Sequence, residues 1–572
     1  MNDIRRTVLW VIFGFSMVLL WDRWQVHNGR QATFFPTPPA ATSSTPASAA
    51  PANGASAAGA AATPSAVPPA SPTTAPTPGA VPTGAPTAVA MPREAVTVTT
   101  DVMKLTFDSE GGTIVRSEFL KFREHDKPKD NLVLLDQSAG RVYLAQTGLI
   151  GAPDLPNHKT PMRFVGNTTL KDGEKELVLR FESAESGGAK LVKTYTLQRG
   201  RYDIAVKHEV VNTGSAPLSP QLYLQLVRDG NKPPGESAFY YTFTGPAVYT
   251  GAKKFQKVEF TDIEKNKAEF EKASKDGYVA MVQHYFASAW LLPDGVQRDL
   301  FMRKVDTNLY SAGLITALPA LAPGASQAVE SRLFVGPQEE KLLEQLYPGL
   351  ELVKDYGWFT ILAKPLYWLL EKLHSFMGNW GWAIIALVFL LKAAFYWLNA
   401  KAYQSMAKMK AINPRVMEMR ERLKDKPQQM QQEMMRIYRE EKVNPLGGCF
   451  PIAVQIPVFI ALYWVLLSSV EMRNAPWLGW ITDLSTPDPW FILPVVMTLT
   501  TLLQTALNPT PPDPLQAKLM WFMPLAFSIM FFFFPAGLVL YWITNNVLSI
   551  AQQWIINTRM GVPPQFNLPK FK

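Results

Sequence analysis

The pattern of hydrophobic and polar residues divides this chain of 572 residues into three unlike stretches. The first has one apolar run followed by a tract of Pro, Ala and Thr. The second alternates apolar and polar residues, and the third has long apolar runs around one basic loop. These patterns predict a multi-domain membrane protein with a periplasmic antiparallel β-sandwich and an α-helical transmembrane bundle.

The N-terminal stretch predicts an anchor and a linker. Arg5 and Arg6 precede an apolar run over residues 8–20, as in a secretory signal, but no small-residue cleavage pattern follows directly. We therefore interpret residues 1–30 as an uncleaved signal-anchor span, with a cleaved signal peptide as the alternative. Residues 31–94 are rich in Pro, Ala and Thr, which cannot bury a core, and predict a disordered linker.

Residues 95–336 predict the antiparallel β-sandwich. Segments such as KELVLRFES alternate apolar and polar residues and are separated by Gly, Asn and Pro. The charged stretch FTDIEKNKAEFEKASKDG predicts a short helix or a loop. Since the chain has a single cysteine, Cys449, no internal disulfide can form, and the sandwich must be stabilised by its own core.

Residues 337–379 predict connecting helices and one amphipathic helix that lies in the membrane interface. Four leucines fall on one face of this helix, while Glu371 and Lys372 fall on another. A helix packed on the sandwich is the alternative. The leucines are Leu366, Leu369, Leu370 and Leu373.

Residues 380–556 predict a core of five membrane spans, which makes six spans with the N-terminal anchor. The loop 399–448 holds eleven Lys and Arg residues, whereas the loop 471–490 holds only Arg473. The positive-inside rule then places both termini, with the tail 557–572, in the cytoplasm and the sandwich in the periplasm of a bacterial inner membrane. The predicted core spans are 380–398, 450–470, 491–507, 519–534 and 537–556.

Lys392 is the chemically informative residue of these spans. It lies roughly eight residues before the predicted cytoplasmic end of its span, about 12 Å deep at 1.5 Å per residue. A charge at the centre of a span costs about 2.5–3.5 kcal/mol or more and marks a functional candidate. The five core spans contain no Asp or Glu, so the ammonium requires water or polar groups. Snorkelling to the interface is the alternative.

Polar residues of the other spans are candidates for a groove around Lys392. Each of them is as consistent with hydrogen bonds that merely join helices. A positively charged pocket without carboxylates suits an acidic or polar peptide segment better than a proton or a cation. The candidates are Gln455, Thr498, Thr501, Gln504, Thr544, Asn545 and Asn546.

The basic loop 399–448 predicts a cytoplasmic hairpin of two helices that meet near Lys426 and Pro427. Methionine side chains form adaptable surfaces, so the hairpin is a candidate partner-binding element, and packing in its own seam is the alternative. Its basic charge suits ribosomal RNA, anionic lipid or a targeting factor. The candidate methionines are Met406, Met409, Met417, Met430 and Met434.

Four motifs in the C-terminal stretch carry a family resemblance. They are HSFMGNWGW at 374–382, MAKM at 406–409, EKVNPLGGCFP at 441–451 and FPAGLVLYWITNN at 534–546. With these motifs the chain resembles the YidC-type membrane protein insertases and their mitochondrial oxidase-assembly and chloroplast Albino relatives. The long sandwich is similar to that of the Gram-negative members only. The resemblance implies a five-span core with a groove open to the cytoplasm and to lipid but closed to the periplasm.

The same resemblance implies an insertase and chaperone for inner-membrane proteins. Its partners would be nascent membrane proteins, the lipid bilayer, the Sec translocon, and ribosomes or signal-recognition components, without specific DNA binding. The family groove usually carries an arginine, where this chain has Lys392, and lysine lacks the bidentate fork of arginine. The family's last span commonly has a Tyr-Tyr contact pair, which here is Tyr541 and Trp542.

Two other functional classes have weaker support in the sequence. A secondary transporter or channel would need paired ionisable groups or repeated halves. A periplasmic enzyme would need a catalytic signature, but HExxH and GxSxG are absent and the histidines are scattered. The sandwich resembles sugar-mutarotase folds, yet a fold alone does not carry function. We expect neither enzyme activity, nor a cofactor, nor a metal site.

Overall fold

The computed structural model describes residues 93–572 except 125–126, 128, 235, 237–241, 425, 442–449, 509–513, 560, 562–565 and 567–572. The predicted anchor and nearly all of the predicted linker lie outside the described residues. All described residues belong to one compact unit, residues 85–572.

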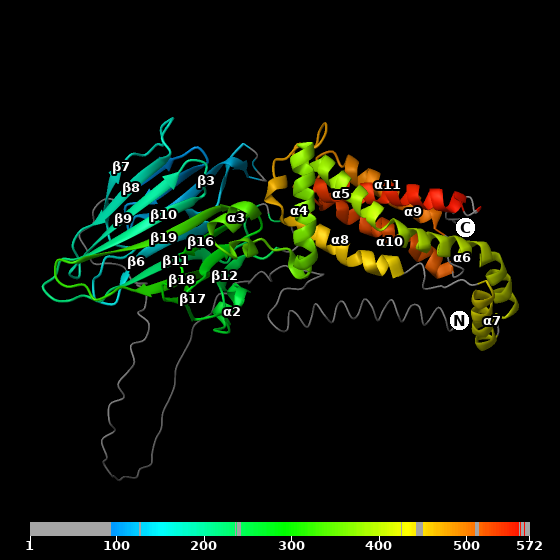
Figure 1. The fold of residues 1–572 in the computed structure, drawn as a ribbon, viewed down its shortest axis with the longest axis horizontal. Coiled ribbons are helices and arrows are strands. Elements are labelled where there is room, and N and C mark those ends of the chain that lie inside the picture. Colours follow the sequence, from blue (N-terminus) through cyan, green and yellow to red (C-terminus); the bar gives the residue numbers. More distant parts are fainter. Residues whose placement is uncertain are drawn as a thin grey trace, which may run out of the picture. The chain divides into compact units, whose positions relative to one another are not determined.

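The sandwich begins with a ten-stranded antiparallel sheet (Figure 1). Its strand order is β1-β2-β3-β6-β11-β18-β17-β14, and β4 pairs with β3 while β5 pairs with β6. The strands are β1 (Ala95–Thr99), β2 (Met103–Asp108), β3 (Thr113–Arg123), β4 (Asn131–Val133), β5 (Asp136–Ser138), β6 (Arg141–Ile150), β11 (Gln221–Asp229), β14 (Ala273–Ser274), β17 (Arg298–Asp306) and β18 (Leu309–Ala317).

The second antiparallel sheet has nine strands in the order β13-β12-β15-β16-β19-β10-β9-β8-β7. A short helix, α2 (Phe260–Glu264), occupies the start of the charged stretch for which a helix or loop was expected. The strands are β7 (Met162–Gly166), β8 (Glu176–Ser183), β9 (Ala189–Gln198), β10 (Asp203–Asn212), β12 (Gly245–Thr250), β13 (Lys254–Lys257), β15 (Tyr278–Val282), β16 (Phe286–Leu291) and β19 (Ser326–Pro337).

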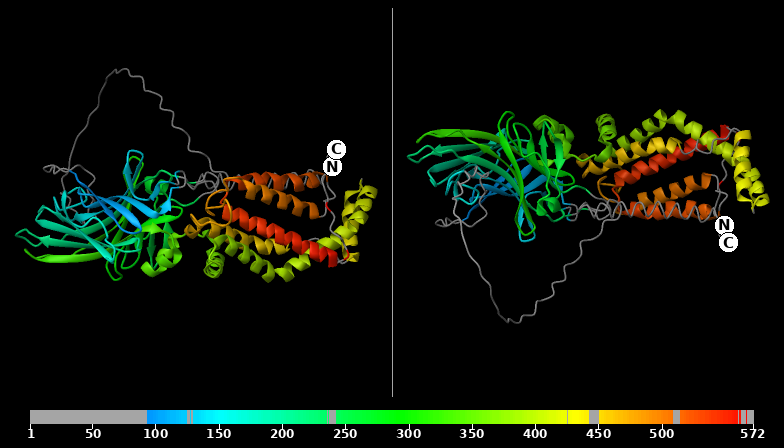
Figure 2. Two further views of the ribbon diagram at one scale, coloured as in Figure 1. Left: turned by 90° about the horizontal axis from the view of Figure 1, so that it is seen from above. Right: turned by 90° about the horizontal axis from the view of Figure 1, so that it is seen from below.

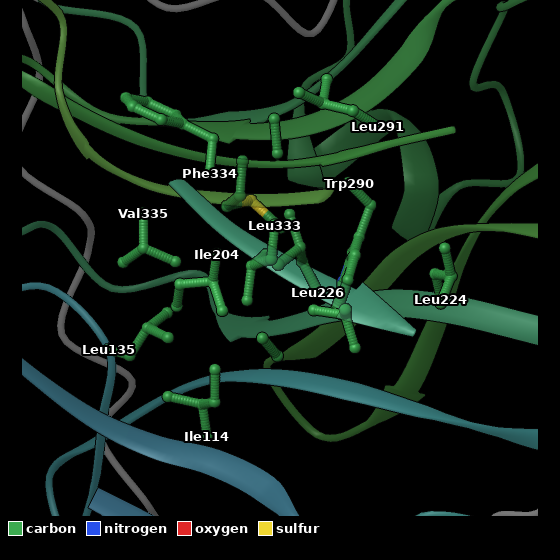
Figure 3. Close-up of a cluster of buried hydrophobic side chains, with 14 of the residues drawn as sticks. Ile114, Leu135, Ile204, Leu224, Leu226, Trp290, Leu291, Leu333, Phe334 and Val335 are labelled. Atoms are coloured by element: carbon green, nitrogen blue, oxygen red, sulfur yellow. The ribbon is translucent and has the colours of Figure 1, made fainter. Parts of the chain in front are cut away.

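Side chains of both sheets meet in one apolar core (Figure 3). Leu224 and Leu226 of β11 come from the first sheet, and Leu333 of β19 comes from the second; all three are completely buried. Trp290 of β16 crosses between the sheets, because its indole Nε1 donates to the carbonyl oxygen of Gln225 at 3.1 Å. The predicted antiparallel sandwich is confirmed.

Basic side chains are also buried in the sandwich. Lys193, completely buried, donates to the carbonyl oxygens of Gly111 at 2.6 Å and Thr147 at 2.8 Å. The Nε2 atom of buried His208 lies 3.0 Å from the hydroxyl of Thr147. Burial lowers the pKa of Lys193 to about 7, lowers the pKa of His158 to about 3, and holds the pKa of His208 well below its usual value. The native sandwich therefore keeps these histidines neutral.

The remainder of the described chain is helical. Figure 1 labels its main helices, and Figure 2 shows them from two further sides. Helix α11 contacts α5, α8 and α9, while α4 contacts α5 and α8. The helices are α3 (Glu340–Leu346), η1 (Leu350–Val353), η2 (Gly357–Phe359), α4 (Thr360–Met377), α5 (Trp380–Ala394), α6 (Tyr396–Arg422), α7 (Pro427–Glu440), α8 (Phe450–Ser468), η3 (Val470–Met472), α9 (Ile492–Leu507), α10 (Pro514–Met530), η4 (Phe531–Phe533) and α11 (Ala536–Arg559).

A bend interrupts the first predicted core span. Residues 380–398 were expected to form one helix, but α5 ends at Ala394 and α6 follows after a bend of 67°. Phe395, with φ −90° and ψ 8°, leaves the helical conformation, and neither Pro nor Gly marks this break in the sequence. The first hairpin helix consequently begins at Tyr396 and not at residue 399.

By length and apolarity, no single helix among the described residues is sufficient to cross a membrane. The bent pair Trp380–Ala394 and Tyr396–Met409 is long and apolar enough to cross a membrane when both helices are taken together. Shorter apolar helices cover Val454–Ser468, Ile492–Leu507 and Ala517–Phe533. The six spans and their orientation thus remain predictions.

Helix α4 has one buried and one exposed apolar side. Ala363, Tyr367 and Leu370 are buried in the apolar cluster of the helical region. Ile361 and Phe376 are 88% and 91% exposed. The leucine face on which the interfacial prediction rested packs into this cluster, and the exposed apolar side chains of α4 are different residues. The interfacial position therefore stays a prediction.

A buried ion pair holds the start of the helical region. The Nζ atom of fully buried Lys354 lies 3.0 and 3.1 Å from the two carboxylate oxygens of Glu471. The hydroxyl of Tyr367 in α4 donates to the same carboxylate at 2.6 Å. Lys354 Nζ also lies 4.1 Å from the centre of the Tyr367 ring. Both charges are therefore compensated locally.

Breaking this pair should be costly. In Lys354→Met the carboxylate of Glu471 loses its buried cation, and we expect the free energy of unfolding to fall by about 3 kcal/mol or more. Guanidinium unfolding of the detergent-solubilised protein measures the change. The matched variant Lys354→Met/Glu471→Gln leaves no unpaired charge and should recover part of the loss. Equal stability of wild type and Lys354→Met would contradict this assignment.

The sandwich should lose stability in acid. The unfolded chain binds a proton at each histidine near pH 6.5, whereas His158 and His208 stay neutral in the folded state until much lower pH. Stability should therefore decline as pH falls from about 7 to 4, by up to about 1.4 kcal/mol per pH unit for each histidine. Amide hydrogen exchange of the strands, corrected for intrinsic rates, measures the decline. A profile flat over this range would disprove it.

Candidate functional site

The end of α5 positions Lys392. The residue lies in the last turn of this helix, two residues before Ala394. The depth estimate, which took the helix to continue roughly eight residues beyond Lys392, therefore overstates its distance from the helix end. The unpaired carbonyl groups at a helix C-terminus favour a nearby cation, which reduces the cost of placing the ammonium there.

Lys392 lines a small pocket between helices. We call this the Lys392 pocket. Only about 10 Å³ of it is open to the centre of a water molecule, which is about the space of one water. The described residues that line it include no Asp or Glu. They are Val388, Leu391 and Lys392 of α5, Phe395 at the bend, Asn399 of α6, Gln455 and Val458 of α8, and Tyr541 and Asn545 of α11.

The ammonium of Lys392 is held by a hydroxyl of another helix. Its Nζ atom donates to Oγ of Ser549 in α11 at 2.7 Å. Ser549 is buried and in turn donates to the carbonyl oxygen of Asn545, one turn earlier, at 2.7 Å. No acidic group acts on Lys392 within the described part of the chain. The cation thus points to a neighbouring helix, which argues against snorkelling as its main interaction.

The structure brings only part of the expected groove together. Gln455, Tyr541 and Asn545 line the pocket with Lys392, as expected. Sequence reasoning missed Asn399 and Ser549. Ser549 carried a signal, because it lies one helical turn after Asn545, whereas the bend at Phe395 separates Asn399 from Lys392.

The expected groove residues of α9 do not line the pocket. Thr501 accepts a hydrogen bond from Nδ2 of Asn546 in α11 at 2.8 Å, so this pair joins two helices. The hydroxyl of Thr498 donates to the carbonyl oxygen of Pro494 in its own helix. Gln504, also in α9, is absent from the pocket lining. Thr501 and Asn546 therefore form a hydrogen bond between helices, which was the alternative to lining the groove.

The predicted aromatic contact pair is divided between two environments. Tyr541 is buried and lines the Lys392 pocket. The ring of Trp542 packs against Phe459 of α8, with 4.6 Å between ring centres, and against Phe531 at 4.9 Å. The pocket is consequently bounded by a phenol, and an aromatic cluster lies directly beside it. Thr544, one turn after Leu540, donates to the carbonyl oxygen of that residue.

The methionines of the hairpin α6–α7 also differ in exposure. Met430 and Met434 pack against a seam formed by Val416, Met419 and Ile437. Met417 is 46% exposed, and Met435, which was not among the candidates, is 47% exposed. Met406 and Met409 are partly buried on α6. The side chains of Met430 and Met434 therefore pack within the hairpin, whereas the side chain of Met417 is exposed to a partner.

The site can bind an anion but has no metal-binding chemistry. It offers an ammonium, a hydroxyl and amide groups, all of which can donate hydrogen bonds to a carboxylate. Among the described residues, no group of three His, Cys, Asp or Glu side chains could hold a metal ion. The arrangement therefore suits a polar or acidic ligand that approaches from outside the chain.

Two family models match this chain and together cover most of it. Residues 95–369 match the YidC periplasmic domain, and residues 372–562 match the 60Kd inner membrane protein family. The chain is 55% identical over 559 residues to the membrane protein insertase YidC of Cupriavidus necator, with 98% of both chains covered. It is 56% identical over 563 residues to that of Cupriavidus metallidurans, and 54% identical to that of Ralstonia nicotianae, with the same coverage.

Solved structures show weaker likeness. A crystal structure of an active YidC insertase with its first transmembrane domain resolved covers 81% of this chain and 92% of that chain, at 17% identity and a TM-score of 0.38. An aldose 1-epimerase-like protein of Escherichia coli covers 43% of this chain and 100% of that chain, at 11% identity and a TM-score of 0.27. At these TM-scores neither match adds to the argument.

The Asn546–Thr501 hydrogen bond should contribute to stability. Asn546→Leu keeps the side-chain volume but removes the donor, and we expect a loss of about 0.6–1.7 kcal/mol, the range for interhelical hydrogen bonds in membranes. Thr501→Val is the matched partner variant. A double-mutant cycle, measured by unfolding in detergent, should give a coupling energy of this size. Strict additivity of the two single changes would show that the bond contributes nothing.

Proposed function

Because this chain belongs to the YidC family of membrane protein insertases, we propose that it inserts its clients through the Lys392 pocket. It is an inner-membrane insertase and not an enzyme, and its β-sandwich is the periplasmic domain of the family. The proposal concerns the residues that act on the client and the route that the client takes.

One observation carries the proposal. The Lys392 ammonium lies in a pocket between apolar helices, and its hydrogen-bond partner there is the neutral hydroxyl of Ser549. A cation without a carboxylate in such surroundings is incompletely compensated. A client carboxylate would supply the missing charge, and charge-assisted hydrogen bonds are roughly twice as strong as neutral ones.

We propose the following order of events. The hydrophilic N-terminal tail of the client enters from the cytoplasmic side and places an acidic or polar group beside Lys392. The hydrophobic segment of the client slides along the lipid-facing side near Tyr541 and Trp542. The tail then crosses, driven by partition of the hydrophobic segment and by the membrane potential, which contributes about 2.3 kcal/mol per charge per 100 mV.

Topology and partners complete the proposal. Six spans place both termini and the hairpin α6–α7 in the cytoplasm, following the positive-inside rule. The exposed Met417 and the basic residues of the hairpin suit delivery by ribosomes or signal-recognition components. Insertion proceeds alone or together with the Sec translocon. Domain limits follow the sequence boundaries, except that the hairpin helix begins at Tyr396.

Reversing the charge at residue 392 tests the groove role. Lys392→Glu should repel acidic tails and lower the insertion rate of single-span clients by about tenfold or more, which corresponds to a cost of about 1.4 kcal/mol or more. Lys392→Arg keeps the charge and should stay close to wild type. Insertion is measured by protease protection in reconstituted vesicles. Wild-type rates for Lys392→Glu with acidic-tailed clients would exclude the proposed role of the charge.

A further inference from the structure

We propose that Asn399 is a second donor for the client, so that the Lys392 pocket binds a carboxylate through an ammonium and an amide together. This inference rests on the proposed function and deepens it. It assigns a specificity-determining role to a residue on α6, the helix that continues into the cytoplasmic hairpin.

Asn399 lines the pocket and has a buried donor that no described residue uses. Its side chain is only 7% exposed, and it lines the same pocket as Lys392. The amide atom Nδ2 is buried and has no hydrogen-bond partner among the described residues. A buried donor without a partner costs about 1–3 kcal/mol, so a ligand that accepts from it would recover this energy.

Local structure holds Asn399 in this position. The residue lies in the first turn of α6, where its backbone N–H donates to the carbonyl oxygen of Phe395 at 3.0 Å. Lys392 and Asn399 belong to different helices, separated by the bend at Phe395, yet both contribute to one pocket lining. The backbone of Asn399 is thus fixed by the helix, and its side chain contributes to the pocket lining from there.

Ser549 makes the exchange of partners inexpensive. Its hydroxyl accepts from Lys392 at 2.7 Å and donates to the carbonyl oxygen of Asn545 at 2.7 Å. When the ammonium turns to a client carboxylate, Ser549 still donates to the carbonyl oxygen of Asn545. The hydroxyl thus acts as a neutral placeholder that leaves no new unsatisfied group behind.

This arrangement selects for acidic groups. A carboxylate has two acceptor oxygens, so one can accept from the Lys392 ammonium and the other from Nδ2 of Asn399. The side-chain amide of a neutral client has one acceptor oxygen and no charge. Removal of the Asn399 donor should consequently weaken the preference for acidic over neutral tails, whereas a purely structural residue would affect both kinds of tail equally.

The experiment compares two clients that differ only by Asp or Asn in the tail. Asn399→Leu keeps the shape but removes the donor. We expect it to slow insertion of the Asp-tailed client about tenfold, the loss of one hydrogen bond to a charged group, and to slow the Asn-tailed client less than about twofold. Asn399→Gln, which retains an amide, should restore most of the preference. Protease protection in reconstituted vesicles gives the rates, and thermal unfolding in detergent checks that each variant folds.

A second variant covers the case in which Asn399→Leu does not fold. Asn399→Asp places a carboxylate in the pocket next to Lys392, and it should slow the Asp-tailed client selectively by occupying the ammonium. An equal fold-change of both clients' rates relative to wild type in every folded variant, or no change in either rate, would overturn the role of Asn399.

Lys392→Gln, measured in parallel, separates this inference from the proposed function. If Lys392→Gln abolishes the preference for the Asp-tailed client while the Asn399 variants leave it intact, only the second donor is refuted. If Lys392→Gln also preserves the preference, both the role of the Lys392 charge and the role of Asn399 as a second donor are refuted.

Discussion

The proposed function of the helical region depends on one hydrogen bond, from the Lys392 ammonium to the Ser549 hydroxyl. A cation between apolar helices must be compensated, and the partner chosen decides what the site can do. A carboxylate partner would neutralise the charge permanently. A hydroxyl stabilises the cation enough for the helices to pack, and leaves most of its electrostatic attraction available to a ligand from outside.

Two acidic groups in the segments between the helices, Glu471 and Asp488, are committed to other partners. Glu471 is paired with Lys354 and accepts from Tyr367. The carboxylate of Asp488 accepts from Nε1 of Trp480 and from two backbone N–H groups at the start of α9. These satisfied carboxylates order the loops around the bundle. The polar residues between helices, such as the Asn546–Thr501 pair, are equally committed to each other.

The sandwich compensates its buried basic groups in a different way from the helical region. Its buried basic groups, Lys193 among them, are satisfied by backbone carbonyls, and its stability comes from one large apolar core shared by two sheets. This arrangement differs from the Lys392 pocket, because Lys193 is completely buried and already donates to two backbone carbonyl oxygens. The sandwich thus satisfies its buried basic residues within the fold, whereas the helical region leaves the charge of Lys392 available to a ligand.

The sequence alone determined the kinds of elements and the residue of chemical interest. Period-two alternation predicted the sandwich strands, apolar runs predicted the helices α5, α8, α9, α10 and α11 to within a few residues, and a lysine in an apolar run marked Lys392. The sequence suffices for these features because each depends only on residues that are close together in the chain.

Only the tertiary structure decided which polar groups meet. The bend at Phe395 has no local signal, and the pairing of Lys392 with Ser549 joins positions 157 residues apart. Periodicity tells which face of a helix is polar but not which neighbour that face will meet. Thr501 and Asn545 therefore looked alike in the sequence, although one joins α9 to α11 and the other lines the pocket. Packing of whole helices, which depends on all their side chains at once, separates the two.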